Sequence, residues 1–76
     1  MREITEAQAQ ELANLLKMTI AVDENKDVSG FFMEPYQCIG GWMPSHDESP
    51  LDSWGCFPIR IISSRPWAEQ IWRPRG

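Results

Sequence analysis

Cysteine and histidine are scarce in this chain, and long apolar runs are absent. The 76 residues include two cysteines and one histidine. No apolar stretch approaches the ~20 residues that a membrane-spanning helix needs, and residues 1–6 lack the apolar core of a signal peptide. These absences predict a cytoplasmic protein without a membrane partner, in which Cys38 and Cys56 are reduced thiols. A disulfide between them is the alternative, which would stabilise the fold by roughly 3 kcal/mol.

The few residues that could bind a metal or act as a nucleophile are poorly spaced for either role. Zinc ligands usually come in pairs about two to four residues apart, whereas Cys38, His46 and Cys56 are separated more widely. A complete site would also need Asp47 or Asp52 as a fourth ligand. A catalytic thiol needs electropositive surroundings, and the segment around His46 is acidic. We therefore predict no enzyme, no metal and no cofactor, with a small Cys/His metal protein or enzyme as an alternative.

Basic residues are in the minority and are concentrated at one end. The chain has 7 Lys and Arg against 11 Asp and Glu, for a net charge of −4. Residues 1–52 have a net charge of −7, and residues 53–76 have a net charge of +3. Because nucleic-acid-binding domains are usually basic overall, this balance argues against general nucleic-acid binding.

The remaining composition is that of an ordinary globular protein. Hydrophobic residues make up 42% of the chain and charged residues 24%, which predicts one domain over 1–76 with a modest core. The four tryptophans are unusual in so short a chain. A core of this size does not bury all of them, so aromatic surface is expected to be available for contact.

An amphipathic helix is predicted near the N-terminus. Thr5 can act as its N-cap, and Gln8 stands three residues later, as in a capping box. On a helical wheel, five apolar residues form one arc opposite the polar ones, and this arc is expected to pack on a sheet. The arc consists of Ala9, Leu12, Ala13, Leu15 and Leu16.

A β-hairpin is predicted over 18–34. Met18, Ile20 and Val22 alternate with Thr19 and Ala21, which is the pattern of a strand. A polar turn follows at 23–27, and residues 28–34 resume the β pattern. A glycine at position 30, inside the second strand, indicates a bulge or a close backbone approach.

The middle of the chain is predicted to contain a short strand, a turn and a loop. Residues 36–39 have strand character, and Gly40-Gly41 marks a sharp turn or a positive φ. This glycine pair lacks the Lys-Ser/Thr of a phosphate-binding loop. Residues 44–53 contain two prolines and no periodicity, so they are expected to form a loop.

The densest β-forming segment is 56–63, around which the fold is expected to be organised. Its alternation puts Phe57, Ile59 and Ile61 on one face. A face of this kind must be covered by the rest of the chain.

A short helix is predicted after this strand. Ser64 can cap it, Pro66 fits its first turn, and Pro74 ends it. Its apolar residues stand in i, i+4 pairs. They are Trp67, Ala68, Ile71 and Trp72.

These elements predict an α+β fold. An N-terminal amphipathic helix packs on a small, mainly antiparallel sheet of three or four strands, and a short C-terminal helix completes it. The expected core takes apolar residues from every segment. They are Leu12, Leu15, Leu16, Ile20, Val22, Phe31, Ile39, Phe57, Ile59 and Ile61.

Residues 60–75 interleave arginine with tryptophan, and three interpretations are open. Both residue types are enriched at the energetic centres of protein interfaces. The same combination can grip single-stranded nucleic acid through phosphate contacts and base stacking. Alternatively, the rings cap the core and the arginines pair with the acidic part of the chain.

The favoured hypothesis is a non-enzymatic protein-binding module that acts as a stoichiometric inhibitor or adaptor. It is expected to bind a basic surface of a larger protein or nucleoprotein assembly and to block that assembly sterically. Small acidic inhibitors encoded by phages and other mobile elements are similar in size and charge. A nucleic-acid-contacting accessory protein is the alternative. In the favoured hypothesis Trp42 or Trp54 is the anchor, and the acidic loop steers the approach. The expected contact residues are Trp42, Trp54, Asp47, Glu48, Asp52, Arg65, Trp67, Trp72, Arg73 and Arg75.

Overall fold

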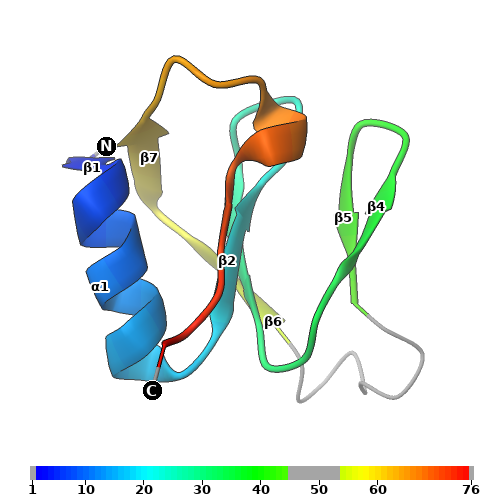
Figure 1. Ribbon diagram of the computed structural model, residues 1–76. Coiled ribbons are helices and arrows are strands. Elements are labelled where there is room, and N and C mark those ends of the chain that lie inside the picture. The colour runs from blue at the N-terminus through cyan, green and yellow to red at the C-terminus, as the bar shows by residue number, and fades with distance from the viewer. Residues whose placement is uncertain (1, 45–53, 76) are drawn as a thin grey trace.

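The computed structural model of the protein describes residues 2–44 and 54–75, and its α+β class agrees with the prediction (Figure 1). One α-helix, eight strands and one short 3-10 helix follow one another along the described chain. They are β1 (Arg2–Thr5), α1 (Glu6–Leu16), β2 (Thr19–Val22), β3 (Val28–Phe31), β4 (Tyr36–Cys38), β5 (Gly41–Met43), β6 (Trp54–Phe57), β7 (Ile59–Ile62), a short 3-10 helix (Trp67–Glu69) and β8 (Ile71–Trp72).

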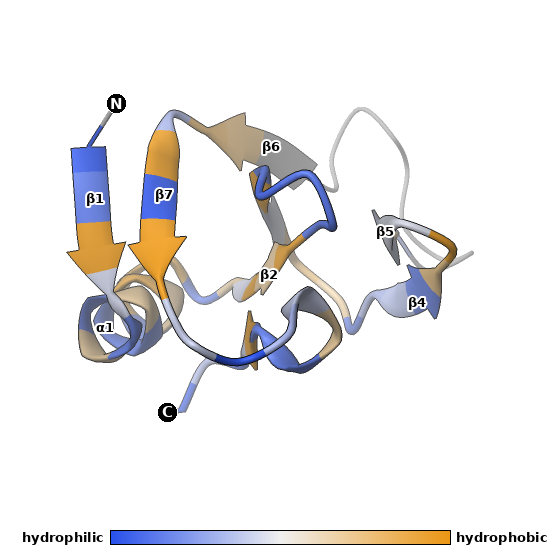
Figure 2. Ribbon diagram, turned by 90° about the horizontal axis from the view of Figure 1, so that it is seen from above, coloured by the Kyte–Doolittle hydropathy of each residue, from blue (hydrophilic) through white to orange (hydrophobic). Residues whose placement is uncertain are grey.

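The strands form three sheets. The largest has four antiparallel strands in the order β6-β3-β2-β8. The strands β4 and β5 form a separate antiparallel hairpin. The third sheet is a parallel pair of β1 and β7, which the sequence pattern did not predict. Seen from above, α1, β1 and β7 lie on one side of the central sheet and the hairpin lies on the other (Figure 2).

The predicted capping box begins α1 and is confirmed. The Thr5 Oγ1 accepts a hydrogen bond from the Gln8 backbone N–H at 3.2 Å, and the Gln8 Oε1 accepts one from the Thr5 N–H at 2.9 Å. The helix stops at Lys17, which takes a left-handed conformation with φ 55°. The two helical residues that are completely buried are Ala9 and Ala13. Their small side chains let the helix backbone lie close to the sheet.

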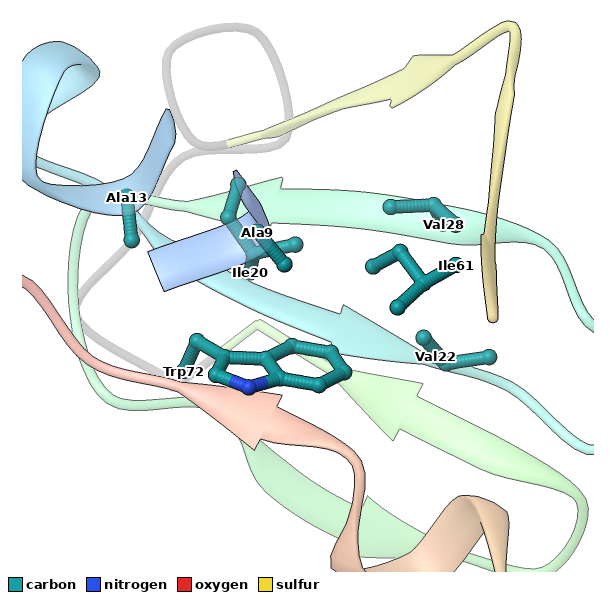
Figure 3. Packing of buried hydrophobic residues seen from close by; sticks show 7 residues of the cluster. All are labelled: Ala9, Ala13, Ile20, Val22, Val28, Ile61 and Trp72. Carbon is teal, nitrogen blue, oxygen red and sulfur yellow. The ribbon is translucent and has the colours of Figure 1, made fainter. Parts of the chain in front are cut away.

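The main core lies between α1, the central sheet and β7 (Figure 3). It is made of Ala9, Ala13, Ile20, Val22, Val28, Ile61 and Trp72. Of the predicted core, Ile20, Val22, Phe31 and Ile61 are buried, while Leu12, Phe57 and Ile59 pack against the core from partly exposed positions.

Three predicted core residues are exposed, and these predictions were wrong. Leu15 is 78% exposed and Leu16 is also exposed, because the helix turns its alanines to the sheet and leaves these leucines at the flanks. Ile39 is fully exposed, with a relative accessibility of 105%, because it stands in the turn of the β4–β5 hairpin and not in a central strand.

The segment 56–63 keeps its predicted alternation but is not one strand. Phe57, Ile59 and Ile61 are partly or fully buried, while the residues between them are exposed. Pro58 interrupts the segment, so β6 pairs with β3 in the central sheet and β7 pairs with β1. Proline has no N–H to donate to a ladder, which explains why the chain changes sheets at this residue.

The C-terminal helix is shorter than predicted. It is a single 3-10 turn over Trp67–Glu69, and Ile71 and Trp72 form β8 instead of continuing it. In β8, Trp72 is paired with Ile20 and Ile71 with Ala21. The apolar spacing of Ile71 and Trp72 therefore reflects pairing with the edge of β2, where the Trp72 ring enters the core.

The predicted hairpin at 18–34 is confirmed as β2 and β3. Its strands pair without a bulge. A Cβ on Gly30 would lie 2.8 Å from the Phe57 ring and 2.9 Å from Met18 Cε, so the close approach at this glycine is made by side chains. Alternation puts Ile20, Val22 and Val28 on the α1 face of the sheet and Phe31 on the face toward the β4–β5 hairpin.

Candidate functional site

The β4–β5 hairpin stands apart from the central sheet (Figures 1 and 2). Its strands are joined by a tight turn in which Gly40 has a φ of 81°, a conformation that L side chains rarely adopt. The predicted strand and turn are thus confirmed, and they form an arm that carries Ile39 at its turn.

Three hydrogen bonds fasten this hairpin to the end of β2 and the turn that follows it. The Trp42 backbone N–H donates to Asp23 Oδ1 at 3.0 Å. The Trp42 indole N–H donates to the Val22 carbonyl at 3.0 Å. The Glu24 backbone N–H donates to the Gly40 carbonyl at 3.0 Å. These bonds pair polar groups of the hairpin with polar groups at the end of β2 and in the turn after it, which fixes the orientation of the arm.

Asp23 is the central residue of this attachment. A Cβ at position 41 would lie 2.9 Å from Asp23 Oδ1, so a glycine is needed there for the carboxylate to reach the Trp42 N–H. Burial raises the pKa of the Asp23 carboxyl above its ordinary value of 3.8. The hydrogen bond from Trp42 opposes this rise, and the charge of Asp27 adds to it.

Exposed apolar side chains gather on the hairpin and on the segment that leads into it. Ile39 is the most exposed of them. Tyr36 and Met43 lie opposite each other in the register, so their side chains are on one face of the hairpin. The full set of exposed large apolar residues between β3 and the end of β5 is Phe32, Met33, Tyr36, Ile39 and Met43.

The Arg/Trp segment is largely engaged within the chain. Trp72 is buried in the core. Arg65 forms an ion pair with Glu6 at the start of α1, and its guanidinium carbon lies 5.7 Å from the centre of the Trp72 ring. Ser63 donates a hydrogen bond to the same Glu6 carboxylate at 3.0 Å.

The last described residues are also held by the body of the protein. Arg73 Nε donates to both carboxylate oxygens of Glu34, at 2.6 and 2.9 Å. The Gln10 side-chain amide donates to the Arg73 carbonyl at 2.6 Å, and the Arg75 N–H donates to Asn14 Oδ1 at 2.7 Å. These contacts agree with the interpretation in which arginines pair with the acidic part of the chain.

The remaining predicted contact residues are placed as follows. Trp42 is half-buried and serves as an attachment of the hairpin, and Trp67 is half-buried on the 3-10 helix. Trp54 contributes its backbone to β6, and its side chain lies outside the described part. Asp47, Glu48 and Asp52 fall outside the described residues, as do His46 and most of the loop predicted for 44–53.

A cleft of about 440 Å³ lies between the β1–β7 pair, the turn after β2 and the 3-10 helix. Its walls carry Glu3 and Arg60, which are neighbours in the parallel register, and also Glu24 and Lys26. The two signs of charge balance, so this lining does not define a class of charged ligand.

The two cysteines are in different sheets, Cys38 in β4 and Cys56 in β6. Cys38 and Cys56 are both free, and Cys56 lies 3.8 Å from the Ser29 hydroxyl. Within residues 2–44 and 54–75, His, Cys, Asp and Glu side chains form no group of three or more that could hold a metal ion.

Two further properties, the lengths of the helices and the similarity to known proteins, give no indication of function. In the part that the structure describes, no helix is both long enough and apolar enough to span a membrane. No protein-family model, curated protein or solved structure matches the chain.

The sequence pattern did not predict that Asp23 fastens the hairpin or that Ile39 is exposed at its turn. The signal for Asp23 was weak, since an acidic residue at the end of a strand is usually solvated. The signal for Ile39 was its position directly before Gly40-Gly41, which puts it in a turn.

Proposed function

We propose that the chain is a non-enzymatic protein-binding module, a stoichiometric inhibitor or adaptor, and that the β4–β5 hairpin is its contact surface. The observation that supports this is the full exposure of Ile39 at the end of a firmly attached arm. A large apolar side chain in that position is not used for folding, and exposed apolar patches commonly mark protein interaction sites.

The attachment of the arm favours binding. The hydrogen bonds from Trp42 and Glu24 orient the hairpin before any partner arrives. A surface that is already ordered loses less conformational entropy on association, so more of the contact energy appears as affinity. Hairpins tied in this way are suited to insert a side chain such as Ile39 into a pocket of the partner.

Charge next to the turn indicates the kind of surface that would accept the arm. A Cβ on Gly40 would lie 3.4 Å from Glu24 Oε2, and Asp23 and Asp27 belong to the same turn. An acidic border around an apolar tip fits an apolar pocket with basic residues at its rim, where opposite charges would speed the encounter. The mechanism would be steric, by occupation of that pocket.

The test is affinity capture from the organism in which the protein occurs, with three forms of the full chain as bait. We expect the wild type to retain one protein in a stoichiometric amount, and Ile39→Asp to lose at least about tenfold of it, as for a central interface residue. Ile62→Asp is the matched control, because Ile62 is an exposed isoleucine on β7, away from the hairpin. It should retain the partner.

Circular dichroism establishes that all three forms are folded. If the wild type retains no stoichiometric protein, or if Ile39→Asp and Ile62→Asp retain it equally, the hairpin is not a contact surface.

A further inference from the structure

An apolar groove lies on the side of the molecule opposite the hairpin. It has a volume of about 350 Å³ and runs between α1 and the β1–β7 pair. Its floor is formed by Ile4, Leu12, Leu15 and Ile59. Of these, Leu15 is 78% exposed, although a chain of 76 residues has few large apolar residues to spare from its core.

The charges on the two walls of this groove are opposite. The strand wall carries Arg2 and the helix wall carries Glu11. Both side chains are exposed, and neither forms an ion pair with any residue that the structure describes. The groove is therefore neutral as a whole but has a positive side and a negative side.

We propose that this groove is the contact surface of a symmetric dimer, in which it is covered by the same groove of a second copy. A two-fold axis brings the same patch of both copies together. When the two-fold axis runs along the groove, the helix wall of each copy lies against the strand wall of the other. The Glu11 of each copy then lies against the Arg2 of the other, and the two Leu15 side chains cover the remaining apolar residues of the groove, Ile4, Leu12 and Ile59.

The position of the groove leaves the hairpins free. In both views α1 and β1 lie at one end of the molecule and β4–β5 at the other (Figures 1 and 2). A dimer through the groove would present two hairpins at its outer ends. This consequence rests on the proposed function of the hairpin. If each hairpin binds a partner, the dimer has two binding sites. On an assembly with repeated sites, the second hairpin then binds intramolecularly once the first is bound, which raises the overall affinity.

The first test is sedimentation velocity of the purified full chain from about 10 µM to about 1 mM, a range that covers weak dimers. We expect the mass to rise with concentration from 8.8 kDa toward twice that value. Leu15→Glu should raise the dimer dissociation constant at least about tenfold, because it places two charges in the centre of the contact. Ile39→Glu, on the hairpin, is the matched control and should leave the constant unchanged. A wild type that stays monomeric throughout overturns the proposal, as does an equal response of the two variants.

The second test uses charge reversal and does not depend on Leu15. We expect Arg2→Glu alone and Glu11→Arg alone each to weaken the dimer about fivefold, since each introduces two like-charged contacts. The double variant restores the opposite pairing and should return the constant to the wild-type value. Failure of this rescue overturns the proposed orientation of the two copies. A wild type that stays monomeric but still captures a partner through Ile39 would reject the dimer and leave the proposed function standing.

Discussion

The two faces of the central sheet are covered in different ways. On the α1 face, Ala9, Ala13 and Trp72 are buried against the sheet, and apolar contact holds the layers together. On the opposite face the β4–β5 hairpin is attached chiefly at one end, by the hydrogen bonds of Asp23 and Trp42. Apolar side chains that hold a segment by burial cannot contact a partner, whereas a segment held by hydrogen bonds can keep its apolar side chains exposed.

This difference explains why the exposed apolar residues are concentrated near the hairpin. A segment held by burial must turn its large side chains inward, and the strength of the contact scales with the apolar area removed from water. A segment held by directed polar contacts can be ordered while Ile39 points into solvent. The first arrangement stabilises the fold, and the second presents a surface.

The largest effect is expected from removing the core ring on the α1 face. Trp72→Ala should lower the free energy of unfolding by about 3–5 kcal/mol, as for other buried aromatic residues. Trp67→Ala is the control, since that ring is only half-buried, and it should have a clearly smaller effect. Urea denaturation followed by circular dichroism measures both. Equal losses would contradict the assignment of Trp72 to the core.

A smaller and local effect is expected on the hairpin face. Asp23→Ala removes the acceptor of the Trp42 N–H, which should cost about 1–3 kcal/mol if that donor is left unsatisfied. Hydrogen exchange of the Trp42 and Glu24 amides should become faster, while the Ile20 amide in the central sheet keeps its rate. Asp27→Ala is the control, because among the described residues the Asp27 side chain accepts a hydrogen bond from Asn25 alone. Faster exchange across the whole sheet after Asp23→Ala would show that the two faces are not independent.

The smallest effect concerns the charge of Asp23. Because the pKa of Asp23 is raised in the folded protein, the folded state binds the proton more tightly than the unfolded state does. The contribution of Asp23 to stability is therefore least favourable at a pH above its folded-state pKa. It becomes more favourable as the pH falls through the folded-state pKa to the lower pKa of the unfolded state. Asp23→Asn, which keeps the acceptor without the charge, should be at least as stable as the wild type at pH 7.

The measurement for this variant is the difference in free energy of unfolding between Asp23→Asn and the wild type across that pH range. The difference should shrink as the pH falls. An advantage of Asn that grows on acidification would show that the sign is wrong. Asp27→Asn, measured in parallel, reports the background change in the same turn.

Much of the fold could be predicted because local signals and the final contacts agree. The Thr5–Gln8 capping box depends only on residues three apart. The alternation of Phe57, Ile59 and Ile61 survives the break at Pro58, because burial on one side is enough to produce it. The parallel pairing of β1 with β7 left no such signal, since it joins segments far apart in the chain.

The candidate site was harder to predict because it depends on which strands lack a neighbour. Residues 36–39 have the same pattern whether they enter a sheet or form a separate arm, so Ile39 was assigned to the core. Trp42 or Trp54 is predicted to anchor a partner, and no signal in the sequence indicated that the Trp42 indole fastens the hairpin to β2. Ile71 and Trp72 fit both helical and strand spacing, and the free edge of β2 determined the outcome.

Pro58 has a further consequence for the mechanical behaviour of the protein. It is the single residue between β6 and β7, and those strands belong to different sheets. A force that peels β7 from β1 is passed through one residue to the pairing of β6 with β3. The two sheets are thus mechanically in series, and neither can slip far along its ladder without disturbing the other.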